Sequence, residues 1–423
     1  MLKFFLGAGS LRMKNLPPVI IDCGSGYTKM GVAGTGGPSH VIPTVLYREG
    51  RDSASALSRA GIFTINISSN SRPMSCIGNA AIRESIADVS GSTKPILDGR
   101  VNDWSDMEEF MAQCYSEYLR IDPSDRVCIL TEPPLNPASN REKLAEAMFE
   151  TFRVPGMYIG VQAVMALYAY WDGKSAMTGT VVDSGDGVTH VIPVTDGYVS
   201  GSSVREIPIA GKDVTRVISD ALQMRKEVVV DNPETAVALN RLAKQIKEKL
   251  AYVCTDPVKE FKVFDASHQS LLKKVNWTDP RTGDARDCDV GYEQFLGPEV
   301  FFQPSLVSSS VNASLPMVLV DSVQASPIDY RKGLFGNIVL SGGSTLFPHF
   351  GSRLEQEISD LTKGTSKVSV VSKMDIQRFA VWHGASNFSQ TEKFDSQVIT
   401  RAEYLEKGPS VARNTTITRC VGL

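Results

Sequence analysis

The sequence has no long hydrophobic run, no excess of basic residues and no closely spaced pair of cysteines. None of its apolar stretches approaches the roughly 20 residues that a membrane-spanning helix needs. The formal net charge is −3, so nothing in the composition would attract a nucleic-acid backbone. The seven cysteines are scattered and form no CxxC pair, which indicates a reducing intracellular compartment. We therefore expect no transmembrane segment and no nucleic-acid partner.

Length and composition are those of an ordinary globular protein with more than one domain. The chain has 423 residues, of which 42% are hydrophobic and 22% charged. Apolar runs of strand length alternate with stretches of helical periodicity, which predicts an α/β fold. The predicted strands cover 19–22, 126–130, 180–183 and 338–340, and the predicted helices begin at about 140, 161, 234 and 345.

Two stretches lack such periodicity. Residues 50–71 are rich in Ser, Ala, Arg and Gly, and we interpret them as a loop or small peripheral subdomain. Residues 1–14 are slightly basic and contain no Asp or Glu. A targeting peptide has this composition, but we interpret the stretch as an extension, with translation starting at Met13.

Two segments place an acid at the end of a predicted strand, followed by a Gly-rich turn and a second apolar strand. They are DCGSGYTK, residues 22–29, and DSGDGVTH, residues 183–190. One such segment alone is typical of an ordinary β-hairpin. Because two occur in matching contexts, one in each half of the chain, we predict two related lobes that bind ATP and a divalent cation in the cleft between them.

The residue types in these segments suit phosphate and a metal ion. Glycine lets backbone N–H groups approach phosphate oxygens, which a side chain would prevent. Ser25 can add a hydroxyl donor and Lys29 can neutralise phosphate charge. Asp22 and Asp183 would repel phosphate, so we expect them to hold hydrated Mg²⁺ or Ca²⁺, because these ions bind carboxylates, phosphates and water.

A third segment, LSGGST at residues 340–345, ends a strand and precedes a predicted helix. This arrangement can bring a ligand close to the backbone at a helix N-terminus, although a tight strand-to-helix connection would show the same pattern. The chain has no GxxxxGK[ST] loop, and no GxGxxG segment follows a strand with a suitable acid downstream.

Four other polar residues are ambiguous on their own. His190 could orient a water, and Gln162 could position an attacking water as glutamine does in some nucleotide hydrolases. Both also suit structural roles, since a single histidine is commonly structural. Lys247 and Glu248 would by themselves be interpreted as the solvated face of a helix.

The motifs resemble, in order and over nearly the whole chain, those of actin and the actin-related proteins. They are DCGSGYTK, VVDSGDGVTH, TEPPLNPASNREKLAEAMFETF, VQAV, IPIAGKDVT, KQIKEKLAYV, IVLSGGSTLFP and QRFAVW. Other stretches, DVGYEQFLGPEVFF and EYLEKGPSVAR among them, are similar to the subfamily that nucleates branched actin filaments. The chain is identified as a divergent member of the family.

The resemblance implies an actin-like ATPase fold, with duplicated ribonuclease-H-like domains and four subdomains around a nucleotide cleft. Subdomain 1 would comprise residues 1–44, 94–169 and 380–423, and subdomain 2 residues 45–93. Subdomain 3 would comprise residues 170–209 and 311–379, and subdomain 4 residues 210–310.

The resemblance also implies a function in the cytoplasm and cytoskeleton. The chain would be a subunit of the complex that nucleates branched actin filaments, and would form part of the template for the daughter filament. Its partners would be actin-related protein 2, the other subunits of that complex, actin filaments and nucleation-promoting factors. ATP or ADP with Mg²⁺ or Ca²⁺ would be the ligand, and slow ATP hydrolysis is left open.

The site residues of the family can be carried over where the motifs match. Gln162 and His190 would arrange the hydrolytic water, and Asp22 and Asp183 would face the metal ion through its waters. Nucleotide-binding roles are implied for Gly24, Ser25, Gly26, Lys29, Ser184, Gly185, Asp186, Gly187, Val188, Gly211, Lys247, Glu248, Gly343, Ser344, Leu346, Phe347 and Arg378.

The sequence departs from the family pattern after Trp382, where it reads HGASNFSQ, and along residues 50–71 and 265–287. We expect these stretches to be adapted to local partners. A sugar kinase would need a further acid facing the γ-phosphate, and no residue is placed for it. A nuclear actin-related protein would show a different signature and insertions, and the subfamily segments argue against a self-polymerising actin.

Overall fold

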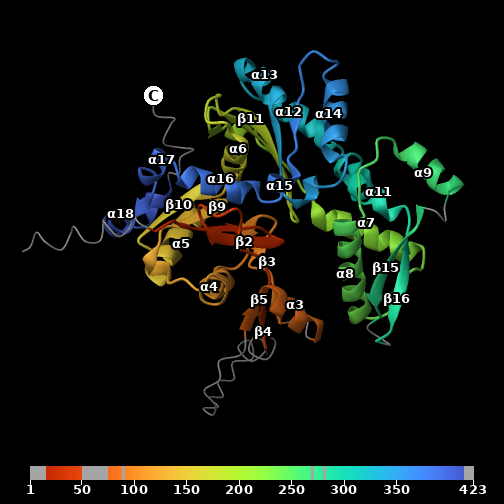
Figure 1. Cartoon of the computed structure of the whole chain (residues 1–423), viewed down its shortest axis with the longest axis horizontal. Coiled ribbons are helices and arrows are strands. Elements are labelled where there is room, and N and C mark those ends of the chain that lie inside the picture. The colour runs from red at the N-terminus through yellow and green to blue at the C-terminus, as the bar shows by residue number, and fades with distance from the viewer. Residues whose placement is uncertain (1–15, 50–74, 88–90, 268–270, 280–282, 414–423) are drawn as a thin grey trace, which may run out of the picture. The chain divides into compact units, whose positions relative to one another are not determined.

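The chain folds into two units, the first of which is discontinuous in sequence (Figure 1). Unit 1 comprises residues 1–169 and 381–423, and unit 2 comprises residues 170–380. The computed structural model describes residues 16–49, 75–87, 91–267, 271–279 and 283–413. The predictions for residues 1–14 and 50–71 lie outside the described residues.

Unit 1 is built on a six-stranded sheet with the order β19-β10-β9-β1-β2-β3. Strands β1, β2 and β3 form an antiparallel meander, and β9 and β10 continue the sheet parallel to β1. The strands are β1 (Val19–Cys23), β2 (Tyr27–Val32), β3 (His40–Pro43), β9 (Cys128–Glu132), β10 (Gly156–Val161) and β19 (Ile399–Thr400).

Unit 2 is built on a sheet with the order β13-β12-β11-β17-β18, in which β14 also pairs with β12. Here β11, β12 and β13 form the antiparallel meander, and β17 and β18 run parallel to β11. The strands are β11 (Gly179–Ser184), β12 (Thr189–Thr195), β13 (Tyr198–Val199), β14 (Arg205–Ile207), β17 (Ile338–Ser341) and β18 (Val370–Val371).

The two sheets therefore repeat one topology, a three-stranded antiparallel meander followed by two strands parallel to its first strand. This repeat confirms the predicted α/β fold with two related halves. The equivalent strands are β1 and β11, β2 and β12, β3 and β13, β9 and β17, and β10 and β18. The four subdomain boundaries stay a prediction.

Helices pack on the sheet of unit 1 and bury large apolar side chains such as Phe110, Met111 and Phe149, each at most 1% exposed. Burying one such side chain stabilises the fold by about 1.5–3 kcal/mol. The helices are α3 (Gly78–Ala87), α4 (Trp104–Gln113), η1 (Cys114–Leu119), η2 (Pro123–Asp125), α5 (Ala138–Glu146), η3 (Ala147–Thr151), α6 (Gln162–Tyr170), α16 (Ala380–Ser389), α17 (Glu392–Asp395), α18 (Arg401–Lys407) and η8 (Pro409–Ala412).

A small sheet of β4 (Leu46–Arg48), β5 (Ser75–Ile77) and β6 (Ser92–Thr93) carries α3 within unit 1. Arg48 joins it to α4 through ion pairs with Asp106 and Glu109. The remaining described strands of unit 1, β7 (Ile96–Leu97) and β8 (Arg100–Val101), form a short hairpin.

The sheet of unit 2 and its larger helices share one apolar core, and Cys254, Phe264 and Phe295 form a smaller separate cluster. The helices of this unit are η4 (Gly201–Ser203), α7 (Gly211–Met224), α8 (Pro233–Lys249), α9 (Pro257–Ala266), α11 (Glu293–Leu296), η5 (Pro298–Phe301), η6 (Pro304–Leu306), α12 (Leu315–Gln324), α13 (Ile328–Gly336), η7 (Gly343–Thr345), α14 (Phe350–Leu361) and α15 (Met374–Gln377).

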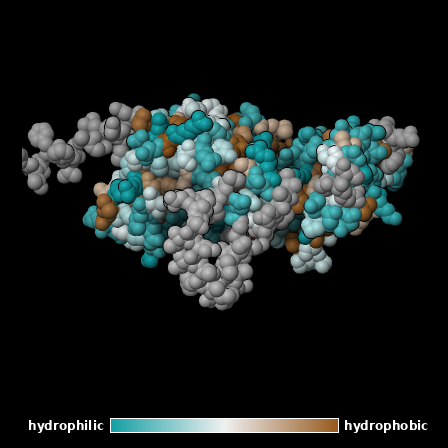
Figure 2. Space-filling view, turned by 90° about the horizontal axis from the view of Figure 1, so that it is seen from below, coloured by the Kyte–Doolittle hydropathy of each residue, from teal (hydrophilic) through white to brown (hydrophobic). Residues whose placement is uncertain are grey.

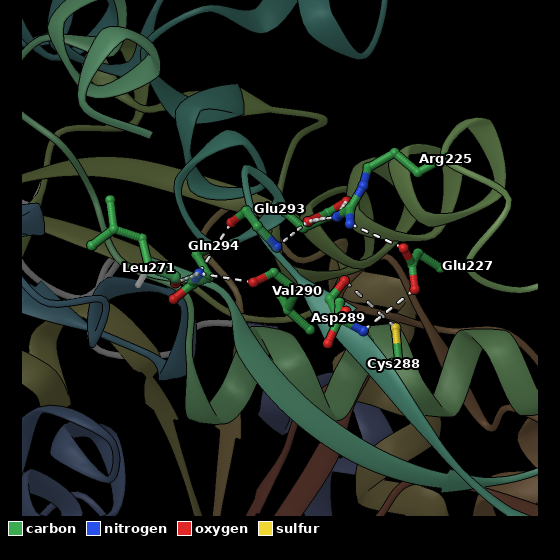
Figure 3. Close-up of polar contacts among 9 residues, drawn as sticks. Arg225, Glu227, Leu271, Cys288, Asp289, Val290, Glu293 and Gln294 are labelled. Atoms are coloured by element: carbon green, nitrogen blue, oxygen red, sulfur yellow. Dashed lines mark hydrogen bonds and ion pairs between the residues drawn. The ribbon is translucent and has the colours of Figure 1, made fainter. Parts of the chain in front are cut away.

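A hairpin of β15 (Lys273–Thr278) and β16 (Ala285–Val290) is joined to α7 and α11 by a polar network (Figure 3). Arg225, which caps α7, donates to both carboxylate oxygens of buried Glu293 at 2.7 and 2.8 Å. Glu293 in turn accepts from the Gly291 N–H at 2.7 Å, and Gln294 donates to the carbonyl oxygens of Leu271 and Val290. The network thus fixes the open end of the hairpin, where β15 begins and β16 ends.

The prediction of a helix starting at about residue 345 was wrong. The SGGST segment leads into the short 3₁₀ turn η7, and α14 begins only at Phe350. Pro348 has no N–H, and His349 has φ of 67°, so the chain cannot run on as one helix. The helix predicted from about 234 is α8, which ends at Lys249, and the helix predicted from about 140 is α5 continued by a π-helical turn, η3.

No helix among the described residues is long and apolar enough to cross a membrane. On the face in Figure 2, hydrophilic residues cover most of the coloured surface, with hydrophobic ones scattered between them.

Candidate functional site

The first candidate phosphate-binding segment is the hairpin of β1 and β2 in unit 1. Its register places Asp22 opposite Lys29 and Cys23 opposite Thr28, so that Gly24, Ser25 and Gly26 lie in the turn. The Gly24 N–H donates to Tyr27 O at 3.1 Å and is therefore used within the turn. The predicted Gly-rich turn between two strands is confirmed.

Asp22 is only 2% exposed, and both of its carboxylate oxygens accept hydrogen bonds. Lys29 Nζ donates to Oδ2 at 2.9 Å, and Thr131 Oγ1 donates to Oδ1 at 2.5 Å. A buried carboxylate needs such partners, because leaving its charge unpaired would cost several kcal/mol. Asp22 and Lys29 therefore stabilise each other.

Polar contacts from neighbouring segments fix the shape of the turn. Thr44 Oγ1 donates to Gly24 O at 2.7 Å and shares a hydrogen bond of 2.9 Å with Thr28 Oγ1. The Ser25 hydroxyl accepts from the Gly99 N–H at 2.8 Å, so its own proton is directed elsewhere. Neither Thr44 nor Gly99 was expected at this turn from the sequence.

The second candidate segment is the hairpin of β11 and β12 in unit 2, which repeats the first. Asp183 lies opposite His190, in the same relationship as Asp22 to Lys29. Ser184 Oγ and Thr189 Oγ1 are 2.7 Å apart, and Thr189 Oγ1 also donates to Ile209 O at 2.6 Å. Gly185, Asp186, Gly187 and Val188 form the turn.

Three elements meet at this second turn. The first N–H groups of α7, those of Gly211 and Lys212, donate to the carbonyl oxygens of Gly185 and Asp186 at 3.0 and 2.9 Å. Ser344 Oγ, from η7, donates to Gly185 O at 2.6 Å. The structure thus brings together predicted residues that are far apart in sequence.

Lys247 reaches the same place from α8. Its ammonium donates to Gly211 O at 2.8 Å and lies 3.7 Å from Asp186 Oδ1. Burial lowers the pKa of Lys247, and the nearby Asp186 carboxylate opposes that effect. Lys247 is 8% exposed, whereas Glu248 is exposed. Lys247 is therefore not part of a solvated helix face, although Glu248 is.

Gly211 leaves no room for a side chain. A Cβ there would lie 2.8 Å from Ser344 Oγ, 3.0 Å from Gly185 O and 3.2 Å from Lys247 Nζ. The close approach of α7, α8 and η7 therefore depends on glycine at this position. Gly211 was expected at the site only from the family resemblance.

The other residues predicted for the base and sugar lie near this junction or follow it in sequence. Gly343 and Ser344 belong to η7, Leu346 follows it, and Phe347 is 8% exposed. Arg378 is exposed and lies with its guanidinium 5.4 Å from the Phe379 ring centroid.

Two residues that sequence reasoning missed hold this segment. Gly342 has φ of +90°, and a Cβ there would lie 2.2 Å from Ser184 O. Buried Gln377 donates to the carbonyl and hydroxyl oxygens of Thr345 at 2.8 and 2.7 Å. The double glycine of SGGST was a readable signal for the first. The second is the first residue of the QRFAVW motif, but sequence reasoning gave Gln377 no role.

Gln162 and His190 belong to different units. Gln162 is the first residue of α6, directly after β10 and therefore at the carboxyl edge of the sheet that also carries Asp22. His190 is 6% exposed on β12, with Nε2 3.4 Å from Glu206 Oε2.

The acidic residues suit a cation that keeps most of its own water. Among the described residues there is no group of three or more His, Cys, Asp or Glu side chains that could hold a metal ion by themselves. Mg²⁺ is commonly bound by one or two carboxylates together with phosphate oxygens and water. Asp22 beside the turn in unit 1 and Asp183 beside the turn in unit 2 are each suited to that mode of binding.

The fold and these two hairpins define a class of protein, and comparison with known sequences agrees. The sequence profile of the Actin family matches residues 13–416. The chain therefore belongs to the actin family, whose fold implies nucleotide binding with a divalent cation.

Curated relatives within this family carry the name actin-related protein 3. The chain is 43% identical to that of Dictyostelium discoideum, over 95% of this chain and 97% of the relative. It is 43% identical to that of Schizosaccharomyces pombe (94% and 96% covered) and 40% identical to that of Saccharomyces cerevisiae (95% and 98% covered). The resemblance to an actin-related protein is thus confirmed over almost the full length of this chain and of each relative.

Proposed function

We propose that this chain binds ATP or ADP with Mg²⁺ or Ca²⁺ and acts as the actin-related protein 3 subunit of the complex that nucleates branched actin filaments. One observation carries the nucleotide part of this proposal, namely the junction of Gly185, Gly211, Lys247 and Ser344. A buried ammonium and a glycine that admits no side chain come together there, where a strand-turn-strand motif meets the start of α7.

In this proposal each of the two hairpins binds phosphate. Lys29 and the turn of residues 24–26 bind phosphate from unit 1, and the turn of residues 184–188 does so from unit 2. Asp22 and Asp183 face the cation through its waters, and the cation supplies charge that offsets the phosphates. The adenosine part is bound by Gly211, Lys247, Glu248, Gly343, Ser344, Leu346, Phe347 and Arg378.

Hydrolysis is the weaker function in this proposal. Gln162 and His190 arrange the attacking water, and the reaction is slow in the isolated chain because assembly completes the geometry. The main use of the nucleotide is to bias the protein toward the conformation that enters the complex.

The proposed partners are actin-related protein 2, the other subunits of the branching complex, actin filaments and nucleation-promoting factors, in the cytoplasm and cytoskeleton. The identity to actin-related protein 3 relatives over 94–95% of the chain supports this assignment. A sugar kinase is not favoured, because the family match is to actin.

Reconstitution with a nucleotide-free and an ATP-loaded chain tests the proposal. We expect the ATP-loaded chain to enter the complex with its partner subunits and the nucleotide-free chain to enter poorly. Equal incorporation would contradict the role given to the nucleotide.

A further inference from the structure

The two donors that hold Asp22 differ in stiffness. Lys29 reaches the carboxylate with a flexible four-carbon side chain that is 22% exposed. Thr131 is a β-branched residue, which restricts its χ1 rotation, and it lies on β9 beside three fully or nearly fully buried residues, 128–130. The hydroxyl of Thr131 is therefore fixed by the sheet, whereas the ammonium of Lys29 can move.

Strand pairing explains why Thr131 reaches Asp22. Strands β1 and β9 are parallel, with Ile21 opposite Leu130, so the next residues of both strands meet at the carboxyl edge of the sheet. The Thr131 hydroxyl donates to Asp22 Oδ1 at 2.5 Å. Hydrogen bonds to a charged acceptor are among the stronger ones in proteins.

The same arrangement of residue types occurs in unit 2. There β11 and β17 are parallel and place Asp183 opposite Ser341, a hydroxyl residue that is 1% exposed. Each repeat therefore has a hydroxyl residue on the neighbouring parallel strand, next to the acid that ends its first strand.

We propose that Thr131 is the positioning residue that keeps the Asp22 carboxylate turned toward the divalent cation when Lys29 binds phosphate. The inference rests on the proposed nucleotide function and deepens it. Thr131 acts through Asp22 and touches neither nucleotide nor cation. Each carboxylate oxygen can accept more than one hydrogen bond, so Asp22 can accept from metal-bound water while it accepts from Thr131.

Loss of the Thr131 hydroxyl should affect only nucleotide binding that involves the cation. Without the Thr131 hydroxyl, the carboxylate rotates or tilts once Lys29 has turned to phosphate, and the cation loses a well-placed acceptor. The affinity for ATP should then fall only in the presence of Mg²⁺, because metal-free ATP makes no use of the carboxylate. A general loss of structure would weaken binding in both conditions.

The test uses the full-length chain and the fluorescent analogue 1,N⁶-etheno-ATP, with the Kd measured in excess Mg²⁺ and in EDTA. Four proteins are compared: the wild type, Thr131→Val, Thr131→Ser and Thr180→Val. Valine matches threonine in shape without its hydroxyl, and serine restores the hydroxyl. Thr180 is a matched control, because it is a fully buried threonine near the start of β11. Its Oγ1 donates to Leu334 O at 3.1 Å.

We expect Thr131→Val to raise the Kd in Mg²⁺ about tenfold, which corresponds to about 1.4 kcal/mol, and to leave the Kd in EDTA within about twofold. Thr131→Ser should recover most of the loss, and Thr180→Val should change neither value. An equal loss in both conditions, or no loss in Mg²⁺, would overturn the inference. If the wild type bound no etheno-ATP in either condition, the proposed nucleotide function itself would fail.

Discussion

Asp22 and Lys29 face each other across the β1–β2 hairpin and form an ion pair of 2.9 Å. Asp183 and His190 occupy the same two positions of the β11–β12 hairpin. In both repeats, the acid that would face a cation thus lies directly opposite a second functional residue. This residue is Lys29, which would face phosphate, in the first repeat and His190, which would face the attacking water, in the second. Phosphate and Asp22 would compete for the ammonium of Lys29.

A first prediction concerns that ammonium. We expect Lys29→Gln to weaken ATP binding at least tenfold, since a hydrogen bond to a charged group contributes about 1.5–3 kcal/mol. Adenosine has no phosphate, so its affinity should change far less. Calorimetric titration of both ligands measures the difference, with Lys143→Gln, an exposed lysine of α5, as the control. Equal losses for ATP and adenosine would show that Lys29 acts only through the fold.

A second prediction concerns the junction at Gly211. Gly211→Ala places a Cβ 2.8 Å from Ser344 Oγ and 3.0 Å from Gly185 O, so the backbone must shift. We expect at least a tenfold loss of affinity for both ATP and adenosine, which is about 1.4 kcal/mol or more. Gly336→Ala is the control, because a Cβ at Gly336 meets no atom within 4 Å. Normal adenosine binding by Gly211→Ala would contradict the role given to this junction.

A third prediction separates buried from exposed ion pairs in unit 2. Glu293 is fully buried and its carboxylate binds Arg225, whereas Asp321 is 65% exposed in its pair with Arg205. Breaking a buried pair costs about 3–5 kcal/mol, whereas an exposed pair contributes about 0–1 kcal/mol. Glu293→Gln should therefore lower the midpoint of urea unfolding clearly, and Asp321→Asn should barely change it. Equal effects would mean that the network in Figure 3 does not hold the hairpin.

A fourth prediction concerns pH. Burial raises the pKa of Glu299 to about 7, an effect that Arg353 opposes and Glu357 reinforces. Glu299 is 2% exposed, with Oε1 3.6 Å from Arg353 Nη2. Because the folded pKa lies above the unfolded one, the contribution of Glu299 to stability is fully present below about pH 4.5 and is lost as the pH rises through about 7.

Glu299→Gln removes this titration. The variant should unfold at higher urea concentration than the wild type at about pH 8, and the difference should shrink toward about pH 6. A tenfold change in the proton affinity of a carboxyl corresponds to about 1.4 kcal/mol, so the effect on the free energy of unfolding is on the order of a few kcal/mol. A difference between the two proteins that did not vary with pH would contradict the assignment to Glu299.

Much of the fold could be predicted because its signals are local. Residues 19–21 and 180–182 form short, largely apolar runs that are followed by an acid and a Gly-rich turn. Both form the strands and hairpins expected of them. The α14 boundary could not be read from helical periodicity, since Pro348 and the left-handed His349 delay the helix to Phe350.

The candidate site was less accessible to sequence reasoning. Lys247 on its own looked like part of a solvated helix face, because its burial depends on Gly211 and Asp186, which are remote in sequence. Thr131 was missed for the same reason, since its contact with Asp22 follows from pairing between β1 and β9. Such contacts arise from tertiary packing, which local pattern does not encode.

Purification of the tagged protein from its own cells under mild conditions tests whether this chain is a nucleotide-binding subunit of a branching nucleator. We expect actin-related protein 2 and the other subunits of the complex to be recovered with it, and the purified assembly to form branches on actin filaments. Recovery of chromatin-remodelling subunits, or of the chain alone with its nucleotide, would contradict the assignment to the branching complex.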